Sequence, residues 1–115
     1  PQYTAASLVS ANKQRCMPNS VDTIDSSNGQ EDHVSMGAAA AIKTWQVVQD
    51  VERVLAIELF TAAQALEFRR PARSSAPLES FVSAFRERVP YVKTDVVMHD
   101  HMEAALAFIR EVPIH

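Results

Sequence analysis

The feature that most constrains the fold is residues 32–68, a run with no proline and a single glycine, Gly37. Apolar or small side chains recur along it at intervals of three and four, with Glu52 as the one interruption. They are Val34, Ala38, Ala41, Trp45, Val48, Leu55, Leu59, Ala62 and Leu66. This spacing is typical of one face of an α-helix. The sequence therefore predicts a single helix of about 35 residues, roughly 50 Å long.

A second apolar row on the same predicted helix consists of Ala40, Val47, Val51, Val54 and Ala65. Two rows indicate a helix that is covered on more than one side. A compact chain of this length has a radius of gyration of only about 13 Å, too small for so long a rod. Either the helix is kinked, or it packs against partners outside these 115 residues.

Shorter helices are predicted on both sides of the long one. Residues 3–14 are alanine-rich and favour a helix, and residues 16–29 contain the turn formers of a structured loop, with a brief extended piece at 21–24. Arg69 and Arg70 suit the C-terminal end of the long helix, and Pro71 terminates it.

Two amphipathic helices are predicted beyond Pro71, at residues 78–89 and 102–112. No segment alternates as paired strands would. We therefore predict an all-α, long-helix bundle in one region, 1–115. It divides into a short helix and loop (1–29), a long central helix (30–70) and two shorter helices (71–115).

Composition narrows the range of functions. The net charge of −3 gives no basic patch for nucleic acid. No uninterrupted apolar run approaches the ~20 residues that span a bilayer, so we expect no membrane association. The single cysteine, Cys16, has no internal partner and is expected to be a buried, inert thiol in a reducing compartment, the cytoplasm.

A polar cluster, Gln30, Glu31, Asp32 and His33, precedes the long apolar run. One interpretation is helix capping, because acidic residues in a first turn satisfy free N–H groups and complement the helix dipole. The other is chemical: Glu31 acts as an acid, base or charge partner, and the Gln30 amide orients a ligand. Composition alone favours capping.

The histidines do not form a recognisable metal motif. His33 has no second histidine four residues away, so a helical ligand pair is absent. His99 and His101 alternate as strand ligands would, but they fall in a predicted connector and are expected to lie in a solvated loop. We predict no metal site.

Three further side chains have structural interpretations. Glu52 and Glu58 lie in apolar surroundings and are expected to form ion pairs with Arg53 or with a partner chain. Trp45 lies on the predicted seam and is expected to belong to the core.

Three segments together resemble a known family. They are "QYTAASLVSANK" (2–13), "SVDTIDSSNGQEDHVSMG" (20–37) and "VERVLAIELFTAAQALEFR" (51–69). They are similar to the C-terminal part of the histidine ammonia-lyases, a branch of the aromatic amino acid lyase family. The "QEDH" run distinguishes this branch from the phenylalanine-specific relatives.

The resemblance implies a long-helix homotetramer that eliminates ammonia from L-histidine to give trans-urocanate, the first step of histidine catabolism. It implies a 4-methylidene-imidazol-5-one (MIO) electrophile, made by cyclisation of an internal Ala-Ser-Gly. It places Glu31 in the active site, near the electrophile and the imidazole side of the substrate. It gives Gln30 a supporting role in the same loop.

One departure from the family pattern limits what this chain does alone. The sequence contains no Ala-Ser-Gly, so we expect it to be inactive by itself. Its exposed apolar rows would favour self-association. Two alternatives stay open: a non-catalytic helical oligomerisation module derived from the lyase scaffold, or a lyase acting on another aromatic amino acid.

Overall fold

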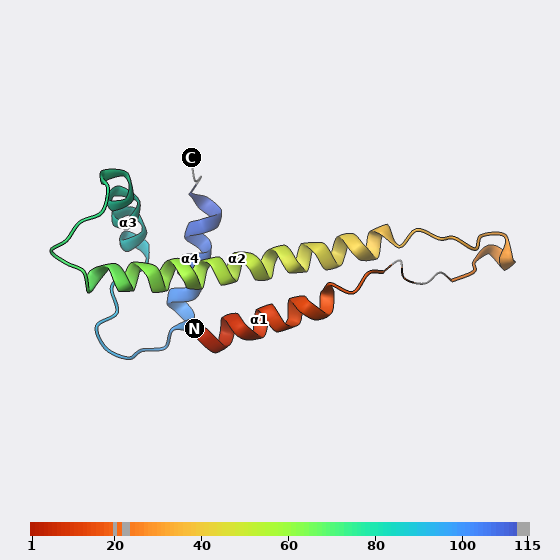
Figure 1. Cartoon of the computed structure of the whole chain (residues 1–115), viewed down its shortest axis with the longest axis horizontal. Coiled ribbons are helices and arrows are strands. Elements are labelled where there is room, and N and C mark those ends of the chain that lie inside the picture. The colour runs from red at the N-terminus through yellow and green to blue at the C-terminus, as the bar shows by residue number, and fades with distance from the viewer. Residues whose placement is uncertain (20, 22–23, 113–115) are drawn as a thin grey trace.

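The computed structural model describes residues 1–19, 21 and 24–112, which form four α-helices and one short 3₁₀ turn (Figure 1). The elements are α1 (Gln2–Arg15), η1 (Ser27–Gly29), α2 (Gly37–Glu67), α3 (Ala76–Arg88) and α4 (His99–Glu111). Within these described residues the only β-type pairing is an isolated bridge between Ser26 and Glu31. The all-α prediction is confirmed.

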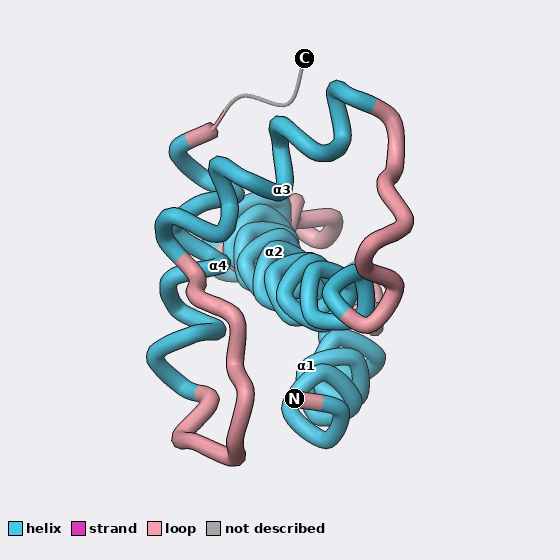
Figure 2. The backbone as a smooth tube through the Cα atoms, turned by 90° about the vertical axis from the view of Figure 1, so that its left-hand side faces the viewer, coloured by secondary structure: helices cyan, strands magenta, loops and turns pink. Residues whose placement is uncertain are grey.

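Helices α1 and α2 form an antiparallel pair joined by a long loop (Figure 1). Viewed along its axis, α2 is flanked by α1 below, α4 to the left and α3 above (Figure 2). Helix α1 has no fully buried residue, but Ala5, Leu8 and Ala11 are half-buried at helical spacing. The ion pair between Arg15 and Asp50 adds a polar contact at the end of α1.

The core lies where the C-terminal half of α2 meets α3 and α4. Its buried members are Ala56, Phe60, Ala63, Phe85, Val89, Ala105, Leu106 and Phe108. Phe85 is fully buried, and its ring meets Phe108 edge-to-face at 5.2 Å between centroids, a favourable geometry for aromatic pairs. The small alanines on α2 and α4 let the two helices approach closely.

The long helix begins later than predicted. It starts at Gly37, not at residue 30 or 32, and ends at Glu67, just before Arg69, Arg70 and Pro71. The Gly37 N–H donates to the Ser35 hydroxyl at 3.3 Å, so a residue beyond the polar cluster satisfies a donor at the helix start.

The predicted seam of α2 is not the face that is buried in this chain. The fully buried residues of α2 are Asp50, Ala56, Ile57, Phe60 and Ala63. Trp45 is 63% exposed, so its assignment to the core is wrong for this chain. The reason is that α3 and α4 cover only the second half of α2, leaving the first half beside α1 alone.

The prediction that Cys16 is buried is wrong, whereas the prediction for Glu52 is confirmed in its ion pair but wrong in naming Arg53 as the partner. Cys16 is exposed because it follows the last turn of α1 at the surface. Glu52 does form an ion pair, but with Arg110 of α4 at 2.6 Å, while Arg53 pairs with Asp50 at 3.6 Å. Glu52 thus links α2 to α4.

His99 and His101 do not lie in a solvated loop, because they occupy the first turn of α4. The His101 ring stacks on Phe60 of α2, with centroids 5.9 Å apart and planes inclined by 15°. This contact draws the start of α4 onto the core and accounts for the early beginning of the helix.

The chain leaves much of its surface uncovered. Its radius of gyration is 20.3 Å, against about 13 Å for a compact chain of this length. Its accessible surface is 8510 Å², against roughly 6,200 Å² expected for its mass. Helix α2 is continuous and runs without a kink (Figure 1), so of the two alternatives for a long rod, packing against chain outside these residues is the consistent one.

Candidate active-site loop

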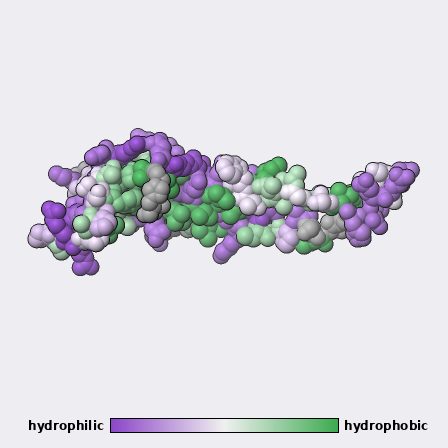
Figure 3. All heavy atoms as spheres, turned by 90° about the horizontal axis from the view of Figure 1, so that it is seen from above, coloured by the Kyte–Doolittle hydropathy of each residue, from purple (hydrophilic) through white to green (hydrophobic). Residues whose placement is uncertain are grey.

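Residues 16–36 connect α1 to α2 and project past the N-terminal end of α2, at the opposite end of the molecule from α3 (Figure 1). The tip of this projection has a hydrophilic surface, whereas hydrophobic side chains are exposed along the middle of the molecule (Figure 3). We call residues 24–36 the tip and residues 16–19 the stem. Residues 22 and 23, half of the segment predicted to be extended, lie outside the described residues.

The tip is closed by backbone hydrogen bonds around Ser26 and Glu31. The Ser26 N–H donates to the Glu31 carbonyl at 2.8 Å, and the Glu31 N–H donates back to the Ser26 carbonyl at 3.2 Å. Between them, the Gly29 N–H donates to Ser26 at 3.1 Å and the Gln30 N–H to Ser27 at 3.3 Å. The backbone of Gln30 and Glu31 is therefore held in a defined turn.

The residues at the apex of this turn suit its backbone. Ser27, Asn28 and Gly29 have φ values of 53°, 58° and 82°, all in the left-handed region. Glycine adopts this region freely, and asparagine is the most tolerant of the other residues. The "SSNG" sequence thus specifies the turn that presents Gln30 and Glu31.

The side chains of the polar cluster lie outside any helix. Gln30, Glu31, Asp32 and His33 are all exposed, and Glu31 precedes the first residue of α2 by six positions. The capping interpretation is therefore wrong, because the cluster is not in the first turn of α2. Residues 34–36 separate the cluster from the helix.

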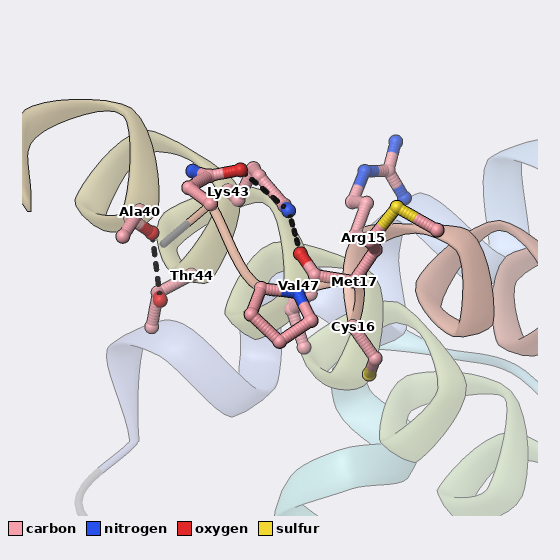
Figure 4. Close-up of a pocket in the computed structure, with 9 residues that line it drawn as sticks. Arg15, Cys16, Met17, Ala40, Lys43, Thr44 and Val47 are labelled. Atoms are coloured by element: carbon pink, nitrogen blue, oxygen red, sulfur yellow. Dashed lines mark hydrogen bonds between the residues drawn. The ribbon is translucent and has the colours of Figure 1, made fainter. Parts of the chain in front are cut away.

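The stem is bound to α2 through Lys43. The Lys43 ammonium donates to the Met17 carbonyl and, at 2.9 Å, to the Asn19 side-chain oxygen (Figure 4). These groups border a cavity of about 320 Å³ between the stem and the first turns of α2. Thr44 lines the same cavity, but its hydroxyl donates to Ala40 within its own helix at 2.9 Å.

The end of α1 is bound to α2 by Arg15. Its guanidinium donates to the Asp50 carboxylate at 2.6 Å and to the Gln46 side-chain oxygen at 3.3 Å. Asp50 is the one buried charged residue among those described, and Arg53 adds a second, longer contact to it. A buried carboxylate requires such partners.

The roles of Lys43, Arg15 and Asp50 were not predicted from the sequence. A signal existed for Lys43 and Asp50, because both are charged residues inside the mostly apolar run. Nothing in the sequence indicated which chain segment each would meet.

The tip offers the carboxylate of Glu31 and the amide of Gln30, which together accept hydrogen bonds from a polar ligand and donate hydrogen bonds to it.

In the part of the chain that the structure describes, no three His, Cys, Asp or Glu side chains gather closely enough to hold a metal ion. No helix there is both long and apolar enough to cross a membrane. The candidate site of this chain therefore consists of a polar loop held between α1 and α2.

Comparison with known proteins identifies the protein family of this chain. The profile of the family described as aromatic amino acid lyase matches residues 1–87. The chain therefore belongs to the aromatic amino acid lyase family. Both the loop and α2 fall inside the matched region.

Within this family, the similar proteins are histidine ammonia-lyases. That of Symbiobacterium thermophilum is 55% identical over 103 residues, covering 90% of this chain and 20% of that protein. That of Anaeromyxobacter sp. (strain K) is 49% identical over 110 residues, covering 96% of this chain and 22% of that protein. The crystal structure of histidine ammonia-lyase from Trypanosoma cruzi superposes with a TM-score of 0.89 at 43% identity, over 93% of this chain and 21% of that one.

The chain thus spans about a fifth of the length of the relatives that it matches. Four-fifths of such a protein lies outside these residues, which agrees with the large uncovered surface.

Proposed function

We propose that this chain is the C-terminal part of a histidine ammonia-lyase, the whole of which eliminates ammonia from L-histidine to give trans-urocanate in the cytoplasm. The observation that carries the proposal is identity of 46–55% to histidine ammonia-lyases over nearly the whole chain. A high TM-score to a solved histidine ammonia-lyase supports it.

In this proposal Glu31 is the active-site residue of the chain. Its side chain is exposed on a turn whose backbone is fixed by the two hydrogen bonds between Ser26 and Glu31. A carboxylate accepts a hydrogen bond from an imidazole N–H and stabilises its protonated form, so it suits the side chain of histidine. Gln30, next to it on the same turn, supplies an amide that orients the substrate or Glu31.

The site is completed by other parts of the assembled enzyme. The tip projects away from the core of this chain, so groups on the opposite side of the substrate come from outside it. From its start to just past its midpoint, α2 exposes Ile42, Trp45, Val48, Val51 and Leu55. Because they follow one another by three or four residues, they form an exposed apolar stripe along one side of the helix, as expected for a helix that packs against further chain in a homotetramer.

The MIO electrophile belongs to the parent and not to this chain. Its precursor, Ala-Ser-Gly, is absent from the 115 residues, so no residue described above forms the group. We therefore expect the chain alone to be inactive and to self-associate through α2.

The test is to incubate the whole parent polypeptide with L-histidine and follow the ultraviolet absorbance of urocanate. Parallel incubations with L-phenylalanine and L-tyrosine test the alternative that another aromatic amino acid is the substrate. Urocanate from L-histidine, with little product from the other two, supports the proposal. Product from one of the other two alone would reassign the substrate, and no product from any would favour a non-catalytic oligomerisation module.

A further inference from the structure

Lys43 connects two segments that are far apart in sequence. Its ammonium binds the Met17 carbonyl, 26 residues away, and the Asn19 side chain, 24 residues away. Lys43 itself lies in the second turn of α2. Both ends of the loop are therefore fixed to one rigid element: the stem through Lys43, and the tip because it leads directly into α2.

Among the contacts of the described residues, those of Lys43 bind the chain closer to the tip than those of Arg15 do. Arg15 binds Gln46 about one turn, and Asp50 about two turns, further along α2 and secures the end of α1. Beyond the stem, the described residues of the loop project past the N-terminal end of α2 (Figure 1). The position of the stem thus sets the direction from which the chain approaches the turn that presents Glu31.

A single cation holding two acceptors is well suited to this task. The ammonium has three donors and no acceptor, so one side chain satisfies a main-chain carbonyl and an amide oxygen at once. Holding the ends of a loop together reduces the number of conformations open to its tip. Small errors in the placement of an active-site group cost large factors in rate.

We propose that Lys43 is a positioning residue for Glu31: by fixing Met17 and Asn19 to α2, it holds the loop in the conformation that places the carboxylate against substrate. This rests on the proposed lyase function. It adds a role for a residue that does not touch the substrate.

The experiment uses the whole parent enzyme and compares Lys43→Met with Lys43→Arg. Methionine keeps the aliphatic length but donates no hydrogen bond, and we expect kcat to fall by about tenfold or more, with a smaller change in KM. Arginine still donates to both acceptors and should restore most of kcat. The matched control is Thr44→Val, which changes the same cavity but no contact to the stem, and should leave kcat unchanged.

A double-mutant cycle separates positioning from general destabilisation. We expect Glu31→Gln alone to lower kcat by about 100-fold or more. If Lys43 acts through Glu31, adding Lys43→Met to that variant causes no further loss. A full additional tenfold loss in the double variant would overturn the proposal, because Lys43 would then act elsewhere.

The two failures are distinguishable. Wild-type kcat in Lys43→Met together with low kcat in Glu31→Gln would overturn only the role of Lys43. Wild-type kcat in Glu31→Gln would overturn the active-site assignment as well. Should Lys43→Met not assemble, Asn19→Ala removes the side-chain acceptor without altering α2, and a kcat no lower than wild type there would count against the proposal.

Discussion

The two halves of α2 differ in what covers them. In the C-terminal half, Ala56, Phe60 and Ala63 are buried under α3 and α4. In the N-terminal half, Ile42 and Trp45 are 62% and 63% exposed, and that half leads into the polar loop. The chain therefore stabilises one end of its long helix by itself. It leaves the other end, which carries the candidate active-site residue, to be covered by chain outside these residues.

The largest expected effect is on the packed half. Phe85→Ala removes a fully buried ring in contact with Phe108 and should lower the free energy of unfolding by about 3–5 kcal/mol. Phe68→Ala is the matched control, since this ring is 78% exposed and its loss should cost within about 0.5 kcal/mol. Denaturant unfolding of the 115-residue chain followed by circular dichroism measures both. Equal losses would show that the core is placed wrongly.

A smaller effect is expected where α1 joins α2. Asp50→Asn removes the charge from a nearly buried carboxylate that binds Arg15 at 2.6 Å, and should cost about 2 kcal/mol. Glu52→Gln weakens the more exposed pair with Arg110 and should cost less than about 1 kcal/mol. The same unfolding experiment compares them. A larger loss for Glu52→Gln would reverse the order of the two ion pairs.

The exposed half is tested by association rather than by unfolding. Trp45→Glu places a charge on the uncovered side of α2 and should shift the chain toward monomer at micromolar concentration, with little change in helix content. Analytical ultracentrifugation measures the shift. Glu87→Gln, at an exposed site on α3, should leave association unchanged. An unaltered distribution in Trp45→Glu would show that this half is not an interface.

The smallest effect is a pH dependence at the start of α3. The pKa of Glu79 is lowered by a hydrogen bond from the Ser74 backbone N–H and then by one from Arg70. A lowered folded pKa gives a stabilisation that is complete above the ordinary glutamate pKa of about 4.3 and is lost as the pH falls through the folded value. The difference in unfolding midpoint between wild type and Glu79→Gln should therefore shrink from about pH 6 to about pH 3. A constant difference would contradict this origin.

Much of the fold was predictable because helical periodicity is a local signal. Residues 3–14, 78–89 and 102–112 lie within or close to α1, α3 and α4, and Pro71 correctly marked the end of the long helix. The buried face of α2 was not predictable. Its buried residues, Asp50, Ala56, Ile57, Phe60 and Ala63, belong to neither of the two predicted apolar rows. Only the positions of α1, α3 and α4 decide which side of the helix this chain covers.

The assignment of Gln30 and Glu31 to the site stays a prediction, and the geometry of their loop was not predictable from the sequence. The "QEDH" run pointed to Gln30 and Glu31, whereas composition favoured a cap that the structure does not contain. The turn at Asn28 and Gly29, which directly precedes the cluster, is set by left-handed backbone angles. The contacts of Lys43 join segments more than 20 residues apart, and no local pattern specifies such pairs.

The central claim is that the loop end of the chain provides an active-site residue while the packed end provides stability. The most direct test is the kcat for urocanate formation from L-histidine by the whole parent carrying Glu31→Gln, beside Asp25→Asn on the same loop as control. We predict a loss of about 100-fold or more for Glu31→Gln, with Asp25→Asn close to wild type and an unchanged thermal midpoint in both. A kcat for Glu31→Gln equal to that of Asp25→Asn would contradict the claim.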